Sequence, residues 1–476
     1  MVKSYNSVTQ KSVLFYGEAS HHNSDHSTVY SLNFLEAFML VDTLIHARWI
    51  IPVEPESVTY EHHSLVIHEG KIIDLLPTEL ANQKYQSTQT ENLENHALLP
   101  GLINCHTHAA MTLLRGVADD LPLMDWLQNH IWPLEQQWVN AEFVKDGTDL
   151  AIAEMILGGT TCFNDMYFFP EVTAAQAIER GIRAKVGLIV IDFPTAWAQN
   201  SDDYIAKGLA LQEQLSDSAL CSTAFAPHAP YTVSDEPLQK IKTLADSLNI
   251  PVHIHVHETA HEVDQALSQS GKRPLERLND LGLVNPALIA VHMTQLTEAE
   301  INLLASQGAN IVHCPESNLK LASGFSPIAK CLEAGINVAL GTDGAASNND
   351  LDMFGEMKTA ALLGKAVAND ASAIPAMTAL RMATINGAKA LGIEDTCGSL
   401  TIGKEADVIA IDLSSLEMQP LYCPVSHLVY AANRQQVTDV WVSGKRLLKQ
   451  RQLTTFDQEA LKEKIKTWQQ RISTKE

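Results

Sequence analysis

Two histidines, His106 and His108, have the residue type and spacing of metal ligands, in the stretch ALLPGLINCHTHAAM. If Leu102 to His106 is a buried strand, its period of two sends both imidazoles to the same side of the strand's end. Two neutral imidazoles on one face are good zinc ligands, but a site needs further His, Asp or Glu side chains. The remaining ligands must therefore come from later in the chain.

Later candidates occur where other apolar runs end. His253, His255 and His257 alternate in IPVHIHVHE, so a strand places all three on one face and the period alone does not choose between them. Glu258 follows them directly. Asp343 stands in LGTDGAAS, where the apolar run VALG would bury it; the alternative is an ordinary Asp-Gly surface turn. These side chains could meet if one sheet carries all the strands.

The alternation of elements predicts such a sheet. After Gly101, apolar runs are separated by helical stretches such as SDEPLQKIKTLADSLN; the runs are GTTCFNDM, IRAKVGLIVI, LCSTAFAPHAP, IPVHIHVHE, ALIAVHM, NIVHCP and INVALGTDG. Repeated strand and helix over about 250 residues is typical of an α/β protein with a (β/α)8 TIM-like barrel, whose chemistry lies at the carboxyl ends of the strands. A doubly wound open sheet would need a Gly-rich phosphate loop after its first strand, and the sequence has none.

Short β-like runs at both ends of the chain predict a second, smaller unit. MLVDTLIHARWIIPV and HSLVIHEGKIIDLLP precede the barrel, and GSLTIGKEADVIAIDL and VTDVWVSGKRLL follow it, so both ends can close into one small β-sandwich. The predicted organisation is a flexible N-terminal arm at 1–32, sandwich segments at 33–98 and 396–450, a catalytic barrel at 99–395, and a C-terminal segment at 451–476 with a helix from Gln458 to Arg471. Three histidines in the arm are interpreted as a solvated tail: His21, His22 and His26.

Composition excludes several classes of partner. The chain has 476 residues, of which 46% are hydrophobic and 19% charged, so it can bury a large core. Its formal net charge of -23 argues against nucleic acid or an anionic membrane as the partner. A small-molecule ligand is the better expectation, and a homo-oligomer is left open.

Cysteine usage and the lack of apolar segments indicate a cytoplasmic protein. The seven cysteines are scattered, odd in number and without a CxxC pair, which is the pattern of reduced thiols. Cys105 lies between the two histidines in sequence but on the opposite strand face, so we interpret it as a packing residue. No signal-like segment opens the chain, and no stretch reaches roughly 18 uninterrupted apolar residues.

Several separated motifs in the same order carry a resemblance to a known family. PGLINCHTH, HVHE, GTDG and ATINGAKALG…GSLTIGKEADVIAID, spread over roughly residues 35 to 450, resemble the amidohydrolase superfamily. Within it, the run HTHAAMTLLRGVADDLPLMDWLQNHIWPLE resembles the 5'-methylthioadenosine/S-adenosylhomocysteine deaminases. The resemblance implies hydrolytic deamination of a 6-aminopurine nucleoside, most of all 5'-methylthioadenosine, with S-adenosylhomocysteine or adenosine as further substrates. The products would be the inosine analogue and ammonia.

The resemblance also implies a metal set. One zinc ion per chain, or another divalent metal such as Fe²⁺, would be held by His106, His108, His255 and Asp343. His255 is chosen because family members place a glutamate three residues after the ligand, and Glu258 fits. His253 would then lie one layer deeper in the barrel and His257 at its rim.

Catalytic and substrate-binding roles follow from the same resemblance. Glu258 would move a proton to the purine ring nitrogen, His292 would hydrogen-bond the new oxygen, and Asp343 would accept a proton; Glu258 and Asp343 would therefore also contact the substrate. Glu135 would accept hydrogen bonds from the ribose hydroxyls, and His228 would also contact the nucleoside. Each has a structural alternative: a helix-start carboxylate for Glu258, a helix surface residue for Glu135, and packing groups for the two histidines.

The expected pocket has apolar walls and lacks one cation. Met111, Trp126 and Trp132 could enclose a base and a thioether, and His313 and Asn318 could form a loop over the site. Some family members carry an arginine after the third barrel strand, suited to a substrate carboxylate, but here Asp202 and Asp203 occupy that loop and no arginine follows until Arg273. Arg183 precedes the loop, within the strand-like run. We therefore expect 5'-methylthioadenosine to be preferred over S-adenosylhomocysteine.

Two other functions remain open at this point. The same metal site could act on another amino- or chloro-substituted heterocycle, such as guanine or a triazine, and the pocket residues would decide between them. A non-catalytic binding protein on the same fold would be expected to lack a ligand or Glu258, and the sequence retains all of them.

Overall fold

The computed structural model describes residues 38–473, and the predicted N-terminal arm lies outside them. In this range the chain forms one sheet of eight parallel strands, in the order β12-β11-β10-β9-β8-β7-β6-β5. Their bounds are β5 Leu102–Thr107, β6 Thr160–Asp165, β7 Arg183–Val190, β8 Cys221–Pro227, β9 Val252–Val256, β10 Leu288–His292, β11 Asn310–His313 and β12 Asn337–Leu340. The apolar runs of the sequence therefore form the predicted strands.

Hydrogen bonds between the first and last strands close this sheet into a barrel. The amide of Asp343, just after β12, donates to the carbonyl of His106 on β5 at 3.0 Å. Thr342 and Asn104 are also joined, by two hydrogen bonds of 2.7 and 3.0 Å. The predicted (β/α)8 barrel is confirmed, and the closure places Asp343 directly beside the His106 strand.

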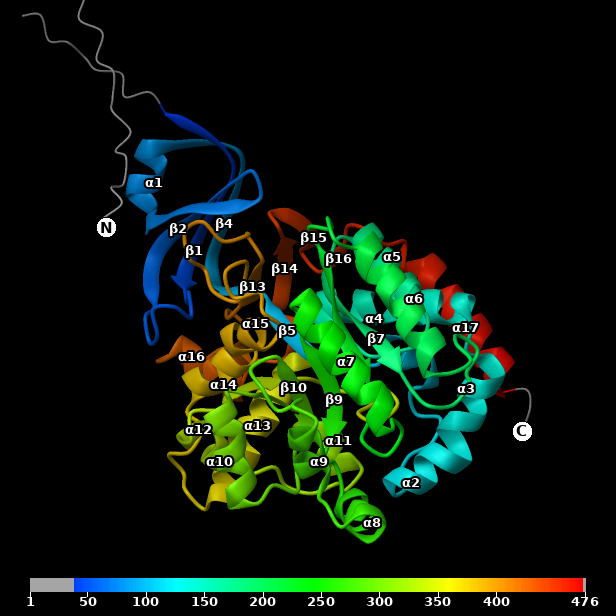
Figure 1. The fold of residues 1–476 in the computed structure, drawn as a ribbon. Coiled ribbons are helices and arrows are strands. Elements are labelled where there is room, and N and C mark those ends of the chain that lie inside the picture. Colours follow the sequence, from blue (N-terminus) through cyan, green and yellow to red (C-terminus); the bar gives the residue numbers. More distant parts are fainter. Residues whose placement is uncertain (1–37, 474–476) are drawn as a thin grey trace, which may run out of the picture. The chain divides into compact units, whose positions relative to one another are not determined.

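Helices surround the barrel and cover the outer face of its strands (Figure 1). The longer ones are α4 Ala141–Leu157, α5 Pro170–Arg180, α6 Ser201–Gln214, α7 Asp235–Leu248, α8 Ala260–Ser270, α10 Glu298–Gln307 and α13 Met353–Ala368. Shorter ones are α2 Leu123–Asp125, α3 Trp132–Trp138, α9 Pro274–Asp280, α11 Pro315–Lys320, α12 Ile328–Glu333, α14 Ala376–Met382 and α15 Ile385–Ala390. Short 3-10 and π turns occupy Ala109–Leu114, Trp126–Ile131, Leu416–Met418 and Arg434–Gln436.

Both ends of the described chain build a second eight-stranded sheet, in the order β16-β15-β14-β13-β4-β1-β2-β3. Its strands are β1 Met39–Ile50, β2 Tyr60–His68, β3 Lys71–Pro77, β4 Tyr85–Pro100, β13 Val408–Asp412, β14 Val437–Val442, β15 Lys445–Lys449 and β16 Gln452–Leu453; helices α1 Thr78–Lys84 and α16 Pro424–Tyr430 interrupt them. The sheet curls around its own core, because Ile72 of β3 hydrogen-bonds Lys404 and Gly403, just before β13. Apolar side chains from both chain ends fill that core.

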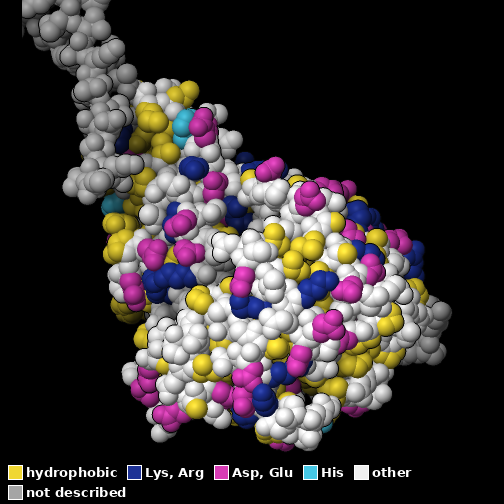
Figure 2. Space-filling view, viewed as in Figure 1, with side chains coloured by type: hydrophobic (Ala, Val, Ile, Leu, Met, Phe, Trp, Pro, Cys, Tyr) yellow, Lys and Arg dark blue, Asp and Glu magenta, His cyan; other side chains and the backbone are white. Residues whose placement is uncertain are grey.

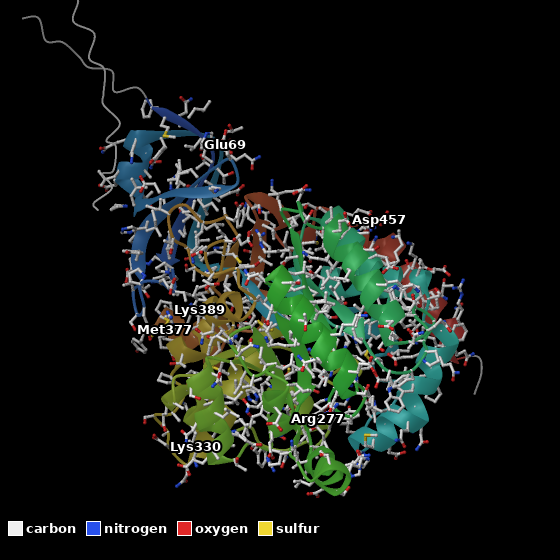
Figure 3. All side chains as sticks on the ribbon, in the orientation of Figure 1. Glu69, Arg277, Lys330, Met377, Lys389 and Asp457 are labelled. Carbon is white, nitrogen blue, oxygen red and sulfur yellow. The ribbon has the colours of Figure 1, made fainter. Side chains whose placement is uncertain are left out.

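Two glycines allow the β2–β3 turn and the β14–β15 turn of this sheet to pack closely together. Gly70 lies at the tip of the β2–β3 hairpin, directly after Glu69, which Figure 3 labels, and Gly444 lies in the β14–β15 turn. Both have positive φ, of +78° and +72°, and a Cβ on Gly444 would lie 3.0 Å from the Gly70 Cα. A larger residue at either turn would push the two hairpins apart.

The C-terminal helix α17, Gln458–Ser473, packs against α4. Trp468 is buried there, and its indole N–H donates to Asp146 at 3.0 Å. Figure 2 shows acidic and basic side chains interspersed on the viewed face. No helix within residues 38–473 is both long enough and apolar enough to cross a lipid bilayer.

Candidate active site

Four side chains from three barrel strands converge at the carboxyl ends of those strands. Their ligand atoms all lie within 4.8 Å of one another; the residues are His106, His108, His255 and Asp343. His106 and His108 each place Nε2 at 3.2 Å from Asp343 Oδ1, and the Nε2 atoms of His106 and His255 are 3.1 Å apart. These are the four residues that the sequence predicts as metal ligands.

Hydrogen bonds on the far side of two rings fix which nitrogen faces the cluster. His108 Nδ1 lies 2.6 Å from the Met166 carbonyl, and His255 Nδ1 lies 2.7 Å from the His228 carbonyl. A carbonyl only accepts, so each Nδ1 carries a proton, and Nε2 is the nitrogen that faces the cluster and would bind a metal ion once it is unprotonated. The arrangement suits the coordination of a divalent cation.

The local electrostatics also favour positive charge at this point. Burial would raise the pKa of Asp343, but hydrogen bonds from His106 and His108 hold it well below its usual range. Burial would lower the pKa of His108, and the hydrogen bond to Asp343 outweighs this and raises it to about 9. A buried carboxylate that stays ionised among three imidazoles fits a bound metal cation, whose charge it would partly neutralise.

Backbone geometry brings Asp343 to its place. A Cβ on Gly341 would lie 2.8 Å from the His106 backbone nitrogen, so only glycine allows this approach. Asp343 itself has a positive φ of 64°, and its Oδ2 accepts hydrogen bonds from Ser317 at 2.7 Å and Ser347 at 2.9 Å. Two hydroxyl donors therefore hold the carboxylate while Oδ1 faces the histidines.

Glu258 and His292 lie next to the cluster. Glu258 Oε2 is 3.8 Å from His292 Nε2, and its Oε1 is 3.5 Å from the Ser323 hydroxyl. Burial raises the pKa of the Glu258 carboxyl, which suits a group that must hold a proton before donating it. His292 Nδ1 is hydrogen-bonded to Asn318 Oδ1 at 2.9 Å, so its Nε2 is left for the site.

A cavity of about 610 Å³ opens over these residues. Its walls include most of the predicted side chains: His108, Met111, Trp126, Trp132, Glu135, His228, His255, Glu258, His292 and Asp343. The cavity is large enough for a nucleoside-sized molecule, and apolar side chains dominate its lining away from the cluster.

Glu135, on α3, faces this cavity with a partner that the sequence did not reveal. The Tyr167 hydroxyl donates to Glu135 Oε1 at 2.7 Å, which leaves the other oxygen for a ligand. Burial raises the pKa of Glu135 to about 7 against the opposing effect of this hydrogen bond. Tyr167, Phe193 and Tyr231 all line the cavity, and no motif in the sequence marks them.

The amidohydrolase family profile matches residues 97–447. A 5-methylthioadenosine/S-adenosylhomocysteine deaminase from Saccharophagus degradans is 53% identical over 431 residues, which cover 90% of this chain and 97% of the relative. The chain belongs to the amidohydrolase family. The resemblance found in the sequence is thereby confirmed.

Solved structures of other amidohydrolase-like chains agree with the fold. An adenosine deaminase from Xanthomonas campestris, with bound zinc, matches with a TM-score of 0.91 and 55% identity, covering 92% of this chain and 100% of that one. An atrazine chlorohydrolase from Arthrobacter aurescens, complexed with zinc, matches with a TM-score of 0.83 over 90% of this chain and 99% of its own. The sequence of this second structure is 21% identical to the present chain, so the match supports the fold and says nothing of the function.

Two other histidines of this amidohydrolase follow the strand alternation only in part: His253 lies where it predicts, and His257 does not. His253 is one layer deeper, as expected, and its Nε2 is 3.0 Å from His106 Nδ1. His257 is not at the rim: it is fully buried, and its Nε2 accepts from the Leu275 amide at 3.1 Å. Strand β9 ends at Val256 and His257 has a φ of 54°, so the alternation stops before it.

The segment expected over the site lines the cavity through Leu321, but not through the two residues named for it. Asn318 binds His292, but neither His313 nor Asn318 lines the cavity. His313 ends β11 and is buried.

The two acids after the third barrel strand do not face the cavity either. Asp202 is exposed on α6 and pairs with Lys240 at 2.6 Å, and Asp203 accepts from the Gln199 amide at 2.9 Å. Arg183 is bound to Asp407 at 3.0 Å, within the barrel wall. The nearest loop residues that line the cavity are uncharged, among them Thr195, Ala196 and Gln199.

Proposed function

We propose that the protein is a zinc-dependent hydrolase that replaces the 6-amino group of a purine nucleoside by oxygen from water. The preferred substrate would be 5'-methylthioadenosine, and the products its inosine analogue and ammonia. One observation carries this proposal. Glu135, whose carboxylate suits the hydroxyls of a ribose, lies in the same cavity as the cluster of His106, His108, His255 and Asp343. The names of the relatives from Saccharophagus degradans and Xanthomonas campestris support it.

One zinc ion per chain would be held by the cluster, where it would activate a water molecule and stabilise negative charge on oxygen. The ring nitrogen beside the reacting carbon must gain a proton when oxygen adds to that carbon. Glu258 is the donor in this proposal, since its carboxyl is buried, has a raised pKa and lies at the cavity wall beside the cluster. His292 would hydrogen-bond the incoming oxygen, and Asp343 would accept a proton.

The rest of the cavity would recognise the nucleoside. Glu135, held by Tyr167, would accept hydrogen bonds from the two ribose hydroxyls. His228 is part of the wall; its Nδ1 is 3.0 Å from the Thr232 hydroxyl, so its other ring nitrogen is left for a substrate contact. Met111, Trp126 and Trp132 would enclose the base and the thioether.

The absence of a cation from this wall predicts selectivity at the 5' position. No lysine or arginine within residues 38–473 lines the cavity. Arg277, labelled in Figure 3 on α9, is bound to Asp235 at 2.6 Å and donates to the Val233 carbonyl. A carboxylate that leaves water without a paired cation costs free energy, whereas a methylthioether does not.

We therefore expect kcat/KM to be highest for 5'-methylthioadenosine and lower for adenosine and S-adenosylhomocysteine, with free adenine and guanine poorer still because they lack ribose. Ammonia release from this panel of compounds tests the proposal. An Ala196→Arg variant should improve S-adenosylhomocysteine selectively, and Ala196→Gln is the matched uncharged control. Guanine or a triazine as the best substrate would overturn the proposed function, and S-adenosylhomocysteine as the best nucleoside would overturn the tail selectivity alone.

A further inference from the structure

The sequence Thr-x-x-Glu begins two helices of the barrel, but its glutamate behaves differently in the two. At α10, Thr297 and Glu300 form a reciprocal capping box, in which Glu300 accepts from the Thr297 amide at 2.8 Å. At α8, Thr259 accepts from the Glu262 amide at 3.2 Å, but no reciprocal capping box forms, and the Glu262 carboxyl accepts hydrogen bonds of 3.1 and 2.7 Å from two earlier amides. The carboxylate of Glu262 is therefore used elsewhere.

Glu262 reaches back to the two residues before its helix cap. Its Oε1 accepts from the His257 amide at 3.1 Å, and its Oε2 accepts from the Glu258 amide at 2.7 Å. The side chain is buried, at 6% exposure, so these hydrogen bonds are shielded from water, and burial raises the pKa of Glu262 to about 8. One carboxylate thus binds two consecutive backbone N–H groups next to the proposed proton donor.

The backbone bends at the same point. His257 has a left-handed φ of 54°, which a residue with a Cβ adopts only when its surroundings hold it there. This bend ends the alternation of β9 and turns the chain so that Glu258 lines the cavity. Glu262 holds the bend from its N–H side.

The carbonyl groups at the bend are held by a residue that follows strand β10. Thr294, just after β10, donates its hydroxyl to the Glu258 carbonyl at 2.7 Å and its amide to the His257 carbonyl at 3.0 Å. By contrast, the Glu258 carboxyl has only a 3.5 Å contact with the Ser323 hydroxyl and lies 3.8 Å from His292. The backbone of Glu258 is fixed while its carboxyl stays available for proton transfer.

We propose that Glu262 is a positioning residue that sets the direction of Glu258 through the backbone of residues 257 and 258, an inference that rests on the proposed function of Glu258. Within residues 38–473, Glu262 does not line the cavity over the cluster, and its side chain hydrogen-bonds none of the four proposed metal ligands. Its loss should therefore change the rate of the chemical step and leave substrate affinity and metal content in place.

The test compares Glu262→Gln with the parent enzyme for 5'-methylthioadenosine at a temperature well below the Tm of both. Gln keeps the size but can offer only one accepting oxygen to two amides, so kcat should fall roughly tenfold with KM within about twofold. Metal content should not change. Thr259→Ala is the matched control, because it removes the α8 cap and leaves the Glu262 carboxyl group. Glu262→Asp serves as a second variant that keeps both carboxyl oxygens but shortens their reach.

A double-mutant cycle with Glu258→Gln separates positioning from general destabilisation. If Glu262 acts through Glu258, adding Glu262→Gln to Glu258→Gln should cost no further loss of kcat. Equal loss in both backgrounds, parent-like kcat in both Glu262 variants, or the same loss in Thr259→Ala would overturn the proposal. Parent-like kcat in Glu258→Gln would reject the role of Glu258 itself, and the positioning role with it.

Discussion

Replacing Glu258 by Gln is expected to lower kcat for 5'-methylthioadenosine by roughly 10²-fold or more, since general acid-base catalysis contributes effects of that size. Gln keeps the shape and one hydrogen-bonding oxygen, but it cannot carry the proton to the purine ring. The raised pKa that burial gives Glu258 is the property that the substitution removes.

The zinc content and the KM of this variant should stay close to those of the parent. Glu276→Gln is a suitable control, because Glu276 is exposed on α9 and its substitution removes the same charge away from the cavity. Steady-state kinetics with elemental analysis of the same preparations gives both readouts. A variant that turned over at the parent rate would show that another group supplies the proton.

The second large effect is expected from the metal cluster. The double substitution His106→Ala with His108→Ala removes two of the four converging ligand atoms, so the site should no longer hold zinc and deamination should fall below detection. The parent should contain about one zinc ion per chain.

A matched control exists for this double substitution in the second sheet. His62 and His63 on β2 are neither buried nor near the cavity, so replacing both by Ala should leave metal content and kcat unchanged. Full zinc content after the loss of His106 and His108 would place the metal elsewhere. Two zinc ions per parent chain would contradict a single-metal site.

The sequence predicts the parts of this site that follow strand periodicity. His106, His108 and His255 lie at strand ends where alternation and burial place them, and Asp343 follows β12, which pairs with β11 and closes on β5. A buried strand leaves few choices for the side on which a residue lies, so local pattern and the family motif agree there.

The contacts that the sequence did not reveal join residues that lie far apart along the chain. Tyr167 meets Glu135 across 32 positions of the chain, and Asn318 meets His292 across 26. His257 was misplaced because its left-handed backbone interrupts the strand period, and Glu262 compensates for that bend from the next helix. No pattern of residue types in the sequence predicts such a backbone bend.

Outside the site, the predicted barrel and the predicted union of the chain ends agree with the structure, but one strand was missed. β4 spans Tyr85–Pro100 and pairs in parallel with β1. Its first half is polar and largely exposed, so the sequence there lacks the apolar alternation by which strands are recognised. Asp202 and Asp203 were likewise placed in a loop near the substrate, whereas they begin helix α6.

The most direct test of the central claim is the fate of 5'-methylthioadenosine incubated with the zinc-loaded protein in water labelled with oxygen-18. We expect one molecule of ammonia per substrate and a purine nucleoside that keeps its methylthioribose and carries one heavy oxygen at position 6. Free adenine, or a product without the heavy oxygen, would contradict hydrolytic deamination at this site.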